Sequence, residues 1–193
     1  YPDENWTWDD LTDASQKIYD KTGKYGFMAY NEDHLGYWDF VYQAGGYILN
    51  EDKTKSGYTD PATARAIKFY VGMQQEDWCP DQTYFAETQP GIAFFSEACA
   101  MYLEGNWELM NKATRYTNME GKWDIAPLPK CPDPAKGDGR ATMSNGLCYS
   151  TAAHGKNLEI VKDVLKFFGT EEAQNIASSY GAAISAYNGT EQP

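Results

Sequence analysis

The sequence contains few basic residues, only two histidines and no basic run. Its 16 Lys and Arg residues are outnumbered by 28 Asp and Glu residues, which gives a formal net charge of −12. Nucleic acid and anionic membrane surfaces are poor partners for a chain of this charge. Neither histidine lies in a recognisable nucleophile motif, so Ser-His-Asp and Cys-His catalysis are disfavoured.

Long apolar runs are also absent. No segment approaches the roughly 18 uncharged apolar residues of a membrane-spanning helix, and no secretory signal occupies the amino end. We therefore expect that this segment does not insert directly into a membrane. Tyr1 is not an initiator Met, and residues 1–5 are typical of a linker, so we expect the sequence to be a piece of a longer protein.

Cysteine is scarce and lacks the spacing of metal ligands. The four residues, Cys79, Cys99, Cys131 and Cys148, include no C-x-x-C pair, so we expect no metal site, and we expect no cofactor either. The even number is compatible with one or two disulfides, of which Cys131 to Cys148 is the first choice. Free buried thiols are the alternative.

Aromatic residues, by contrast, are abundant. They make up 15% of the 193 residues and include 15 Tyr and six Trp, more than a core of this size needs. Tyr and Trp each combine a flat apolar face with a polar tip. We therefore expect some of them to form a binding surface, on a chain long enough for one large domain or two small ones.

The apolar pattern predicts helices separated by short strands. Thr7 and Asp10 can form a capping box, and Gly23 can end the helix that follows. Further helices are expected at about 33–44, 60–78, 90–97, 107–116, 157–168 and 170–181. Short strands are expected at about 24–30, 47–50, 57–59, 100–103, 122–128 and 144–150.

One candidate site follows the strand predicted at 100–103. Gly105 and Asn106 break the apolar run before a helical pattern resumes at Trp107. The turn from strand to helix lies at the rim of an α/β sheet, where ligands bind. An indole flanked by the acceptors of Glu104 and Asn106 suits a ligand with one apolar face and several hydroxyls. The alternative is that Trp107 is a core residue at the sheet edge.

A second candidate site follows the strand predicted at 24–30. The turn after Tyr30 is strongly polar and leads into the next predicted helix. Its candidate ligand-binding residues are Asn31, Glu32, His34, Tyr37 and Trp38. For His34 the alternative is a solvated loop histidine, and for Trp38 it is a place in the core.

Eight short motifs occur in a fixed order along the chain. They are Thr7-Trp8-Asp9-Asp10-Leu11, Tyr25-Gly26-Phe27, Gly45-Gly46, Thr59-Asp60-Pro61, Phe94-Phe95 through Ala100-Met101, Gly105-Asn106-Trp107, Ala126-Pro127-Leu128-Pro129 and Gly155-Lys156-Asn157. Each motif alone is weak, but the ordered series resembles the extracellular solute-binding proteins of family 1. These are the sugar receptors of bacterial ABC importers.

The resemblance implies an α/β fold of the periplasmic-binding-protein-like type II, with a mixed sheet flanked by helices. Receptors similar to this have two lobes that close on the ligand by a hinge movement. Residues 1–145 resemble the second lobe with part of the cleft, and residues 146–193 resemble the hinge-crossing strand and helices of the first. The whole protein would then be extracellular, periplasmic or a cell-surface lipoprotein, and its partners would be ABC permease subunits and a carbohydrate.

The resemblance also implies a site. The Trp of the Gly-x-Trp motif, here Trp107, commonly stacks on a sugar ring in such receptors, and the turn after the first strand contributes side chains to the ligand. The crossing segment passes the ligand, which adds Asn145 and Gly146. Leu35 stands where maltose receptors carry an aromatic residue, so the identity of the sugar stays open.

Two other functions are compatible with the residues. A glycoside hydrolase could pair Glu104 with Glu32 or Asp33, because such enzymes use two carboxylates. A carbohydrate-adhesion domain without catalytic activity could use the same aromatic surface. The resemblance favours a binding protein that is not an enzyme.

Overall fold

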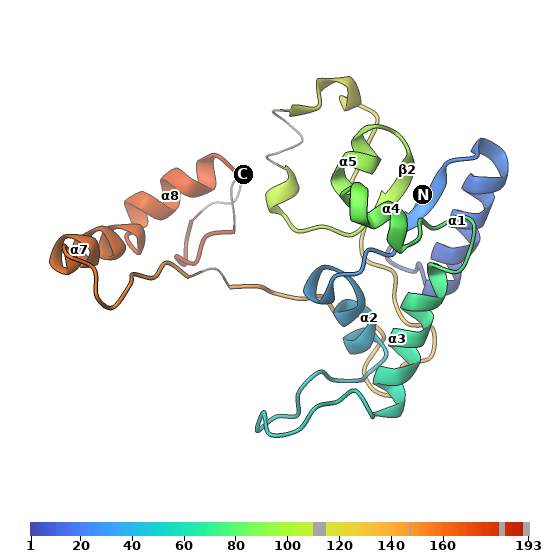
Figure 1. Ribbon diagram of the computed structural model, residues 1–193, viewed down its shortest axis with the longest axis horizontal. Coiled ribbons are helices and arrows are strands. Elements are labelled where there is room, and N and C mark those ends of the chain that lie inside the picture. The colour runs from blue at the N-terminus through green and yellow to red at the C-terminus, as the bar shows by residue number, and fades with distance from the viewer. Residues whose placement is uncertain (110–114, 147, 182–183, 191–193) are drawn as a thin grey trace. The chain divides into compact units, whose positions relative to one another are not determined.

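The computed structural model describes residues 1–109, 115–146, 148–181 and 184–190 (Figure 1). The chain forms two compact units. Unit 1 comprises Tyr1–Leu103 and Gly121–Met143, and unit 2 comprises Glu104–Glu120 and Ser144–Pro193. The assignment of residues 1–145 and 146–193 to the two lobes of a receptor stays a prediction.

Unit 1 begins with α1, Trp8–Thr22, and the predicted capping box is confirmed. The Thr7 backbone N–H donates to the Asp10 carboxylate (2.9 Å), and the Asp10 backbone N–H donates to the Thr7 hydroxyl (3.3 Å). Both bonds satisfy amides that the first helical turn leaves without partners. Gly23 ends the helix at φ 70°, a conformation that costs glycine little.

The sheet of unit 1 is parallel. β1, Tyr25–Met28, pairs with β2, Cys99–Tyr102, in a register that places Phe27 opposite Met101. Among the described residues the sheet consists of these two parallel strands. Parallel strands require a long crossover connection, and the helices between β1 and β2 supply it.

These helices follow the predicted order with one addition. They are η1, Asp33–Tyr37, then α2, Trp38–Gln43, then α3, Pro61–Met73, then α4, Gln82–Glu87, and then α5, Pro90–Phe95. The Asp60 carboxylate caps α3 by accepting from the backbone of Ala62 (3.0 Å) and Thr63 (3.1 Å). The sequence did not predict α4, and α3 ends earlier than the expected 78.

Several predicted strands are wrong. The pair expected at 47–50 and 57–59 is reduced to one antiparallel bridge between Leu49 and Ser56. Residues 122–128 form no strand, and Ile125 there is 66% exposed. Pro127 has no backbone N–H to donate to a neighbouring strand, which disfavours a strand at this position. The described residues of 144–150 are irregular, and Leu147 lies outside the described part of the chain.

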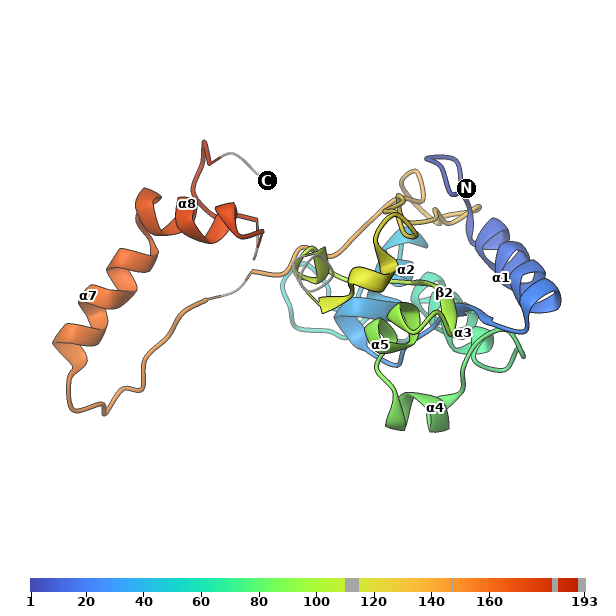
Figure 2. The same ribbon diagram turned by 90° about the horizontal axis from the view of Figure 1, so that it is seen from above.

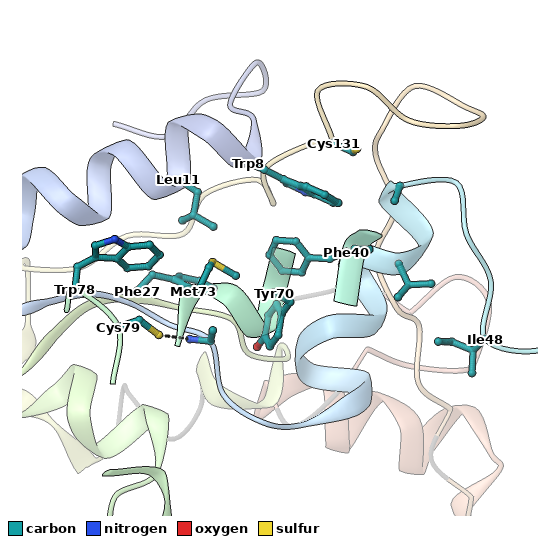
Figure 3. Close-up of a cluster of buried hydrophobic side chains, with 14 residues drawn as sticks. Trp8, Leu11, Phe27, Phe40, Ile48, Tyr70, Met73, Trp78, Cys79 and Cys131 are labelled. Carbon is teal, nitrogen blue, oxygen red and sulfur yellow. Dashed lines mark hydrogen bonds between the residues drawn. The ribbon is translucent and has the colours of Figure 1, made fainter. Parts of the chain in front are cut away.

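The core of unit 1 lies on both sides of β1. Trp8 and Leu11 project from α1 toward Phe27, Phe40 and Tyr70 (Figure 3). This larger cluster also includes side chains of α2 and α3. The next residue, Met28, belongs to a second cluster with Phe85 of α4, Ala93 of α5 and Cys99 of β2. Since neighbouring side chains of a strand point to opposite faces, β1 is covered by helices on both faces.

One glycine permits close packing of α1 on β1. A Cβ at Gly26 would lie 2.3 Å from the Cα of Ser15, and Ser15 is fully buried. No side chain fits between the two backbones at this point.

The regular secondary structure described in unit 2 is helical. α7, Leu158–Phe168, and α8, Glu171–Ser179, pack against each other (Figure 2). Tyr149 stacks on Phe168 with ring centroids 4.6 Å apart. α7 has an apolar face but no buried residue. The helix predicted at 107–116 is helical at Trp107–Leu109 and at Arg115, and residues 110–114 lie outside the description.

The four cysteines are free. Cys79, Cys99 and Cys131 are buried and Cys148 is exposed, so the first-choice disulfide is wrong and the alternative of free thiols is confirmed for three of them. The Cys131 thiol instead accepts a hydrogen bond from Arg65 (3.4 Å). Among the described residues, the structure has no helix that is long and apolar enough to cross a membrane.

Candidate ligand-binding site

The first group of predicted site residues lies in unit 1, on the turn from β1 into η1 and α2. This turn rests on α3, because the buried Tyr70 hydroxyl donates a hydrogen bond to the Tyr30 carbonyl (2.8 Å). A Cβ at Gly36 would lie 2.7 Å from the same Tyr70 hydroxyl. The helix therefore fixes the position of the turn, and the small residue at 36 allows the close approach.

The polar residues of the turn are accessible. Asn31 is exposed, and Glu32 and His34 are half-buried. Asp33 accepts hydrogen bonds from the His34 backbone N–H (2.6 Å) and contacts the His34 ring Nδ1 (2.8 Å). The His34 hydrogen bonds lower the pKa of the Asp33 carboxyl, which therefore stays ionised at neutral pH.

Three consecutive residues of this turn carry possible metal-ligating atoms. The ligand atoms of Glu32, Asp33 and His34 lie within 4.8 Å of one another. Cation sites need several oxygen or nitrogen ligands arranged around the ion. These three groups lie on one exposed turn and Asp33 is already bonded to His34, so the arrangement alone does not make a metal site.

Tyr37 and Trp38 form the apolar part of this group. The Tyr37 hydroxyl lies 2.6 Å from the Tyr58 hydroxyl, and burial together with this bond raises the pKa of Tyr37 to about 12. Trp38 packs against the larger core cluster and is partly buried. The core alternative for Trp38 is therefore supported, and a role in ligand binding stays a prediction.

The second group lies in unit 2, after β2. The Gly105 backbone N–H donates to the Glu104 carboxylate (3.0 Å), which folds that side chain over the turn. Trp107 is 37% exposed, and a Cβ at Gly105 would lie 2.1 Å from two carbons of its indole ring. One part of the indole therefore covers the backbone of its own turn, while the rest is accessible. Asn106 beside it is exposed.

Asn145 and Gly146 also lie in unit 2. Both are exposed, and Gly146 has open space where a Cβ would be. The structure thus brings Asn31, Glu32, His34, Tyr37 and Trp38 together on one turn of unit 1. It brings Glu104, Asn106 and Trp107 together on one turn of unit 2.

Sequence reasoning missed one aromatic residue of the first group. Tyr58 lies 21 residues after Tyr37 and reaches its hydroxyl from the loop that precedes α3. Its only sequence signal is an aromatic residue just before the Asp60-Pro61 helix start, and this signal carries no information about its partner.

The comparisons with known proteins agree with the predicted resemblance. The family described as bacterial extracellular solute-binding protein matches residues 1–175. The chain belongs to this family. A comparison with curated proteins found no match.

Several solved structures of solute-binding proteins share the fold. The GacH receptor of Streptomyces glaucescens is 20% identical, with 98% of this chain and 48% of that chain covered and a TM-score of 0.80. An ABC substrate-binding protein of Listeria monocytogenes, in complex with cycloalternan, is 19% identical, with 97% and 46% covered and a TM-score of 0.75. The sugar-binding protein MalE of Xanthomonas citri is 21% identical, with 98% and 48% covered and a TM-score of 0.70.

These likenesses confirm the expected fold class for this solute-binding protein. It has the α/β architecture of the type II periplasmic-binding-protein-like proteins. The chain spans about half the length of the solved structures that it matches.

Proposed function

We propose that this protein is the extracellular substrate-binding component of an ABC importer and captures a carbohydrate. The observation that carries the proposal is the partly exposed Trp107 indole, packed over Gly105 beside Glu104. A sugar ring has C–H faces that pack on an indole and hydroxyls that require partners. This turn offers both an aromatic face and carboxylate and amide oxygens.

The hydroxyls of a bound sugar need hydrogen-bond partners, which limits the residues that can line the binding site. A buried hydroxyl without a partner costs a complex roughly 1–3 kcal/mol. The accessible polar side chains of the unit 1 turn, those of Asn31, Glu32 and His34, are suitable partners. Asn145 and Gly146 are further candidates on the segment that would cross between the lobes. We propose residues 1–145 as the second lobe and 146–193 as part of the first.

The ligands of the solved structures support a carbohydrate. The GacH receptor was solved in complex with acarbose, and the Listeria protein in complex with cycloalternan. Family membership supports a location outside the cytoplasmic membrane, with permease subunits as partners. The same proposal expects the whole protein to carry a signal segment and, in a Gram-positive organism, a lipid anchor.

We infer that the protein binds its ligand without catalysis, because the family that matches residues 1–175 is described as solute-binding. A glycoside hydrolase pairs an ionised carboxylate with a carboxylic acid whose pKa is raised so that it is protonated near neutral pH. The hydrogen bonds from His34 lower the pKa of the Asp33 carboxyl, so Asp33 does not have the raised pKa of such an acid.

A thermal-shift screen tests the proposal. The longest natural chain that contains these 193 residues is measured against a panel of neutral mono- and oligosaccharides. A sugar that binds only the native state raises the melting temperature by mass action. We expect a shift with at least one sugar that is lost in Trp107→Ala and kept in the control Leu109→Ala, whose side chain is 40% exposed. No shift with any sugar would overturn the proposal.

A further inference from the structure

Tyr37 and Tyr58 form a hydroxyl pair at the edge of the unit 1 turn. Their oxygens lie 2.6 Å apart, a normal distance for a hydrogen bond between two hydroxyls. One phenol donates to the other, so the O–H of the acceptor is not used within the pair. The pair thus leaves one donor and several lone pairs for an outside group, and Tyr58 is 45% exposed.

The neighbouring indole adds a second polar group. Trp38 Nε1 is buried and donates no hydrogen bond of normal geometry to any described residue. It lies close enough to the Tyr37 hydroxyl to lower the pKa of Tyr37, against the larger raising effects of burial and of the bond to Tyr58. Because this N–H is buried, it approaches the phenol pair from the interior, and an outside group meets the pair at the exposed Tyr58.

Both tyrosines are held in place by the surrounding structure. The Tyr37 ring lies 6.4 Å from the ring of the buried Tyr70, centroid to centroid. The loop that carries Tyr58 is tied at Gly57, whose N–H donates to the Ile48 carbonyl (2.8 Å). Preorganised side chains lose little conformational entropy when a ligand binds.

We propose that Tyr58, together with Tyr37 and Trp38, forms a subsite for one hydroxyl-rich, uncharged sugar ring. This inference rests on the proposed carbohydrate-binding function and adds Tyr58 as a residue that determines specificity. The exposed phenol of Tyr58 accepts the C–H side of a ring, and the hydroxyl pair matches its hydroxyls. The three groups are neutral, and the chain carries a net charge of −12, so uncharged sugars are favoured over sugar phosphates.

Isothermal titration of the longest natural chain containing these residues tests the subsite. The probes are glucose, maltose and maltotriose, together with any sugar that shifts the melting temperature. Tyr58→Phe keeps the ring and removes the hydroxyl, and Tyr58→Ala removes both. Tyr1→Phe is the matched control, because Tyr1 belongs to the same unit and is fully exposed.

We expect Tyr58→Phe to raise the Kd about three- to tenfold and Tyr58→Ala to raise it further, with Tyr1→Phe unchanged. The melting temperature without sugar separates binding from folding. If the wild-type chain binds a sugar and both Tyr58 variants bind it equally well, the subsite is wrong and the proposed function stands. A lower melting temperature with an unchanged Kd also overturns the subsite. If the wild-type chain binds no sugar, the proposed function fails and the subsite fails with it.

Discussion

The Trp107 indole lies directly over Gly105, so close that a Cβ at residue 105 would be 2.1 Å from two of its ring carbons. The orientation of the most accessible tryptophan therefore depends on the absence of a side chain two residues earlier. Carbon atoms that are not bonded to each other do not approach so closely, so the indole side chain would have to move if residue 105 carried a Cβ.

Gly105→Ala is expected to weaken sugar binding at least tenfold without a large loss of stability. The added methyl group forces Trp107 into another rotamer, and a stacking face that moves by about 1 Å loses much of its contact. Titration of the variant and of Gly155→Ala measures the effect. A Cβ at Gly155 would meet its nearest neighbours at an ordinary 3.6 Å, so this variant serves as the control. Equal affinity of both variants and the wild type would contradict the importance of this orientation.

The buried Asp39 predicts a pH dependence of stability. Its carboxylate is 6% exposed and accepts the Met143 backbone N–H (2.7 Å) at the end of unit 1. Burial raises the pKa of Asp39, and the hydrogen bonds from Met143 and Thr142 only partly oppose this shift. A raised pKa in the folded state means that the contribution of Asp39 to stability is greatest at low pH and declines as the pH rises through that pKa.

Asp39→Asn removes this titration while its side-chain oxygen can still accept from Met143. The variant is therefore expected to become more stable relative to wild type, with a larger free energy of unfolding, as the pH rises from about 4 to about 8. Urea denaturation at intervals across this range measures the difference. A difference that does not change with pH would contradict a raised pKa for Asp39.

The Tyr37 hydroxyl is expected to lose its proton at an unusually high pH. Burial is the main cause of its pKa of about 12, and the bond to Tyr58 is the second. Tyr58→Phe removes the second cause only, so the pKa of Tyr37 should fall but stay above its usual value. Ultraviolet difference titration, with Tyr37→Phe to identify the signal, measures the shift. An unchanged pKa in Tyr58→Phe would show that the two hydroxyls are not bonded in solution.

Two glycines of unit 1 predict opposite effects on stability. A Cβ at Gly26 would meet the Ser15 backbone at 2.3 Å, so Gly26→Ala should destabilise the fold by about 1–3 kcal/mol. Gly72 lies inside α3 with nothing within 4 Å of its Cβ position, so Gly72→Ala should stabilise by about 0.5–1 kcal/mol. Chemical denaturation of both variants tests the pair. Equal effects would mean that α1 does not pack closely on β1.

Local signals in the sequence predicted the helices of this protein well. The Thr7 capping box, the Asp60 cap and the glycine at residue 23 act through neighbouring atoms, and all three are present. Strands were predicted less well, since a strand exists only when another strand pairs with it. The apolar run near Ile125 has no such partner among the described residues and remains exposed.

The sequence by itself determined the capped starts of α1 and α3, the order of most helices and, through the ordered motifs, the solute-binding family. It also identified the two turns that carry the candidate site residues. Only the tertiary structure decided that Tyr58 meets Tyr37, that Tyr70 supports the turn after β1, and that no cysteine of this chain is paired. The two tyrosine contacts join residues 21 and 40 positions apart in the sequence. Local periodicity cannot encode such contacts, because they form only when distant segments of the chain pack together.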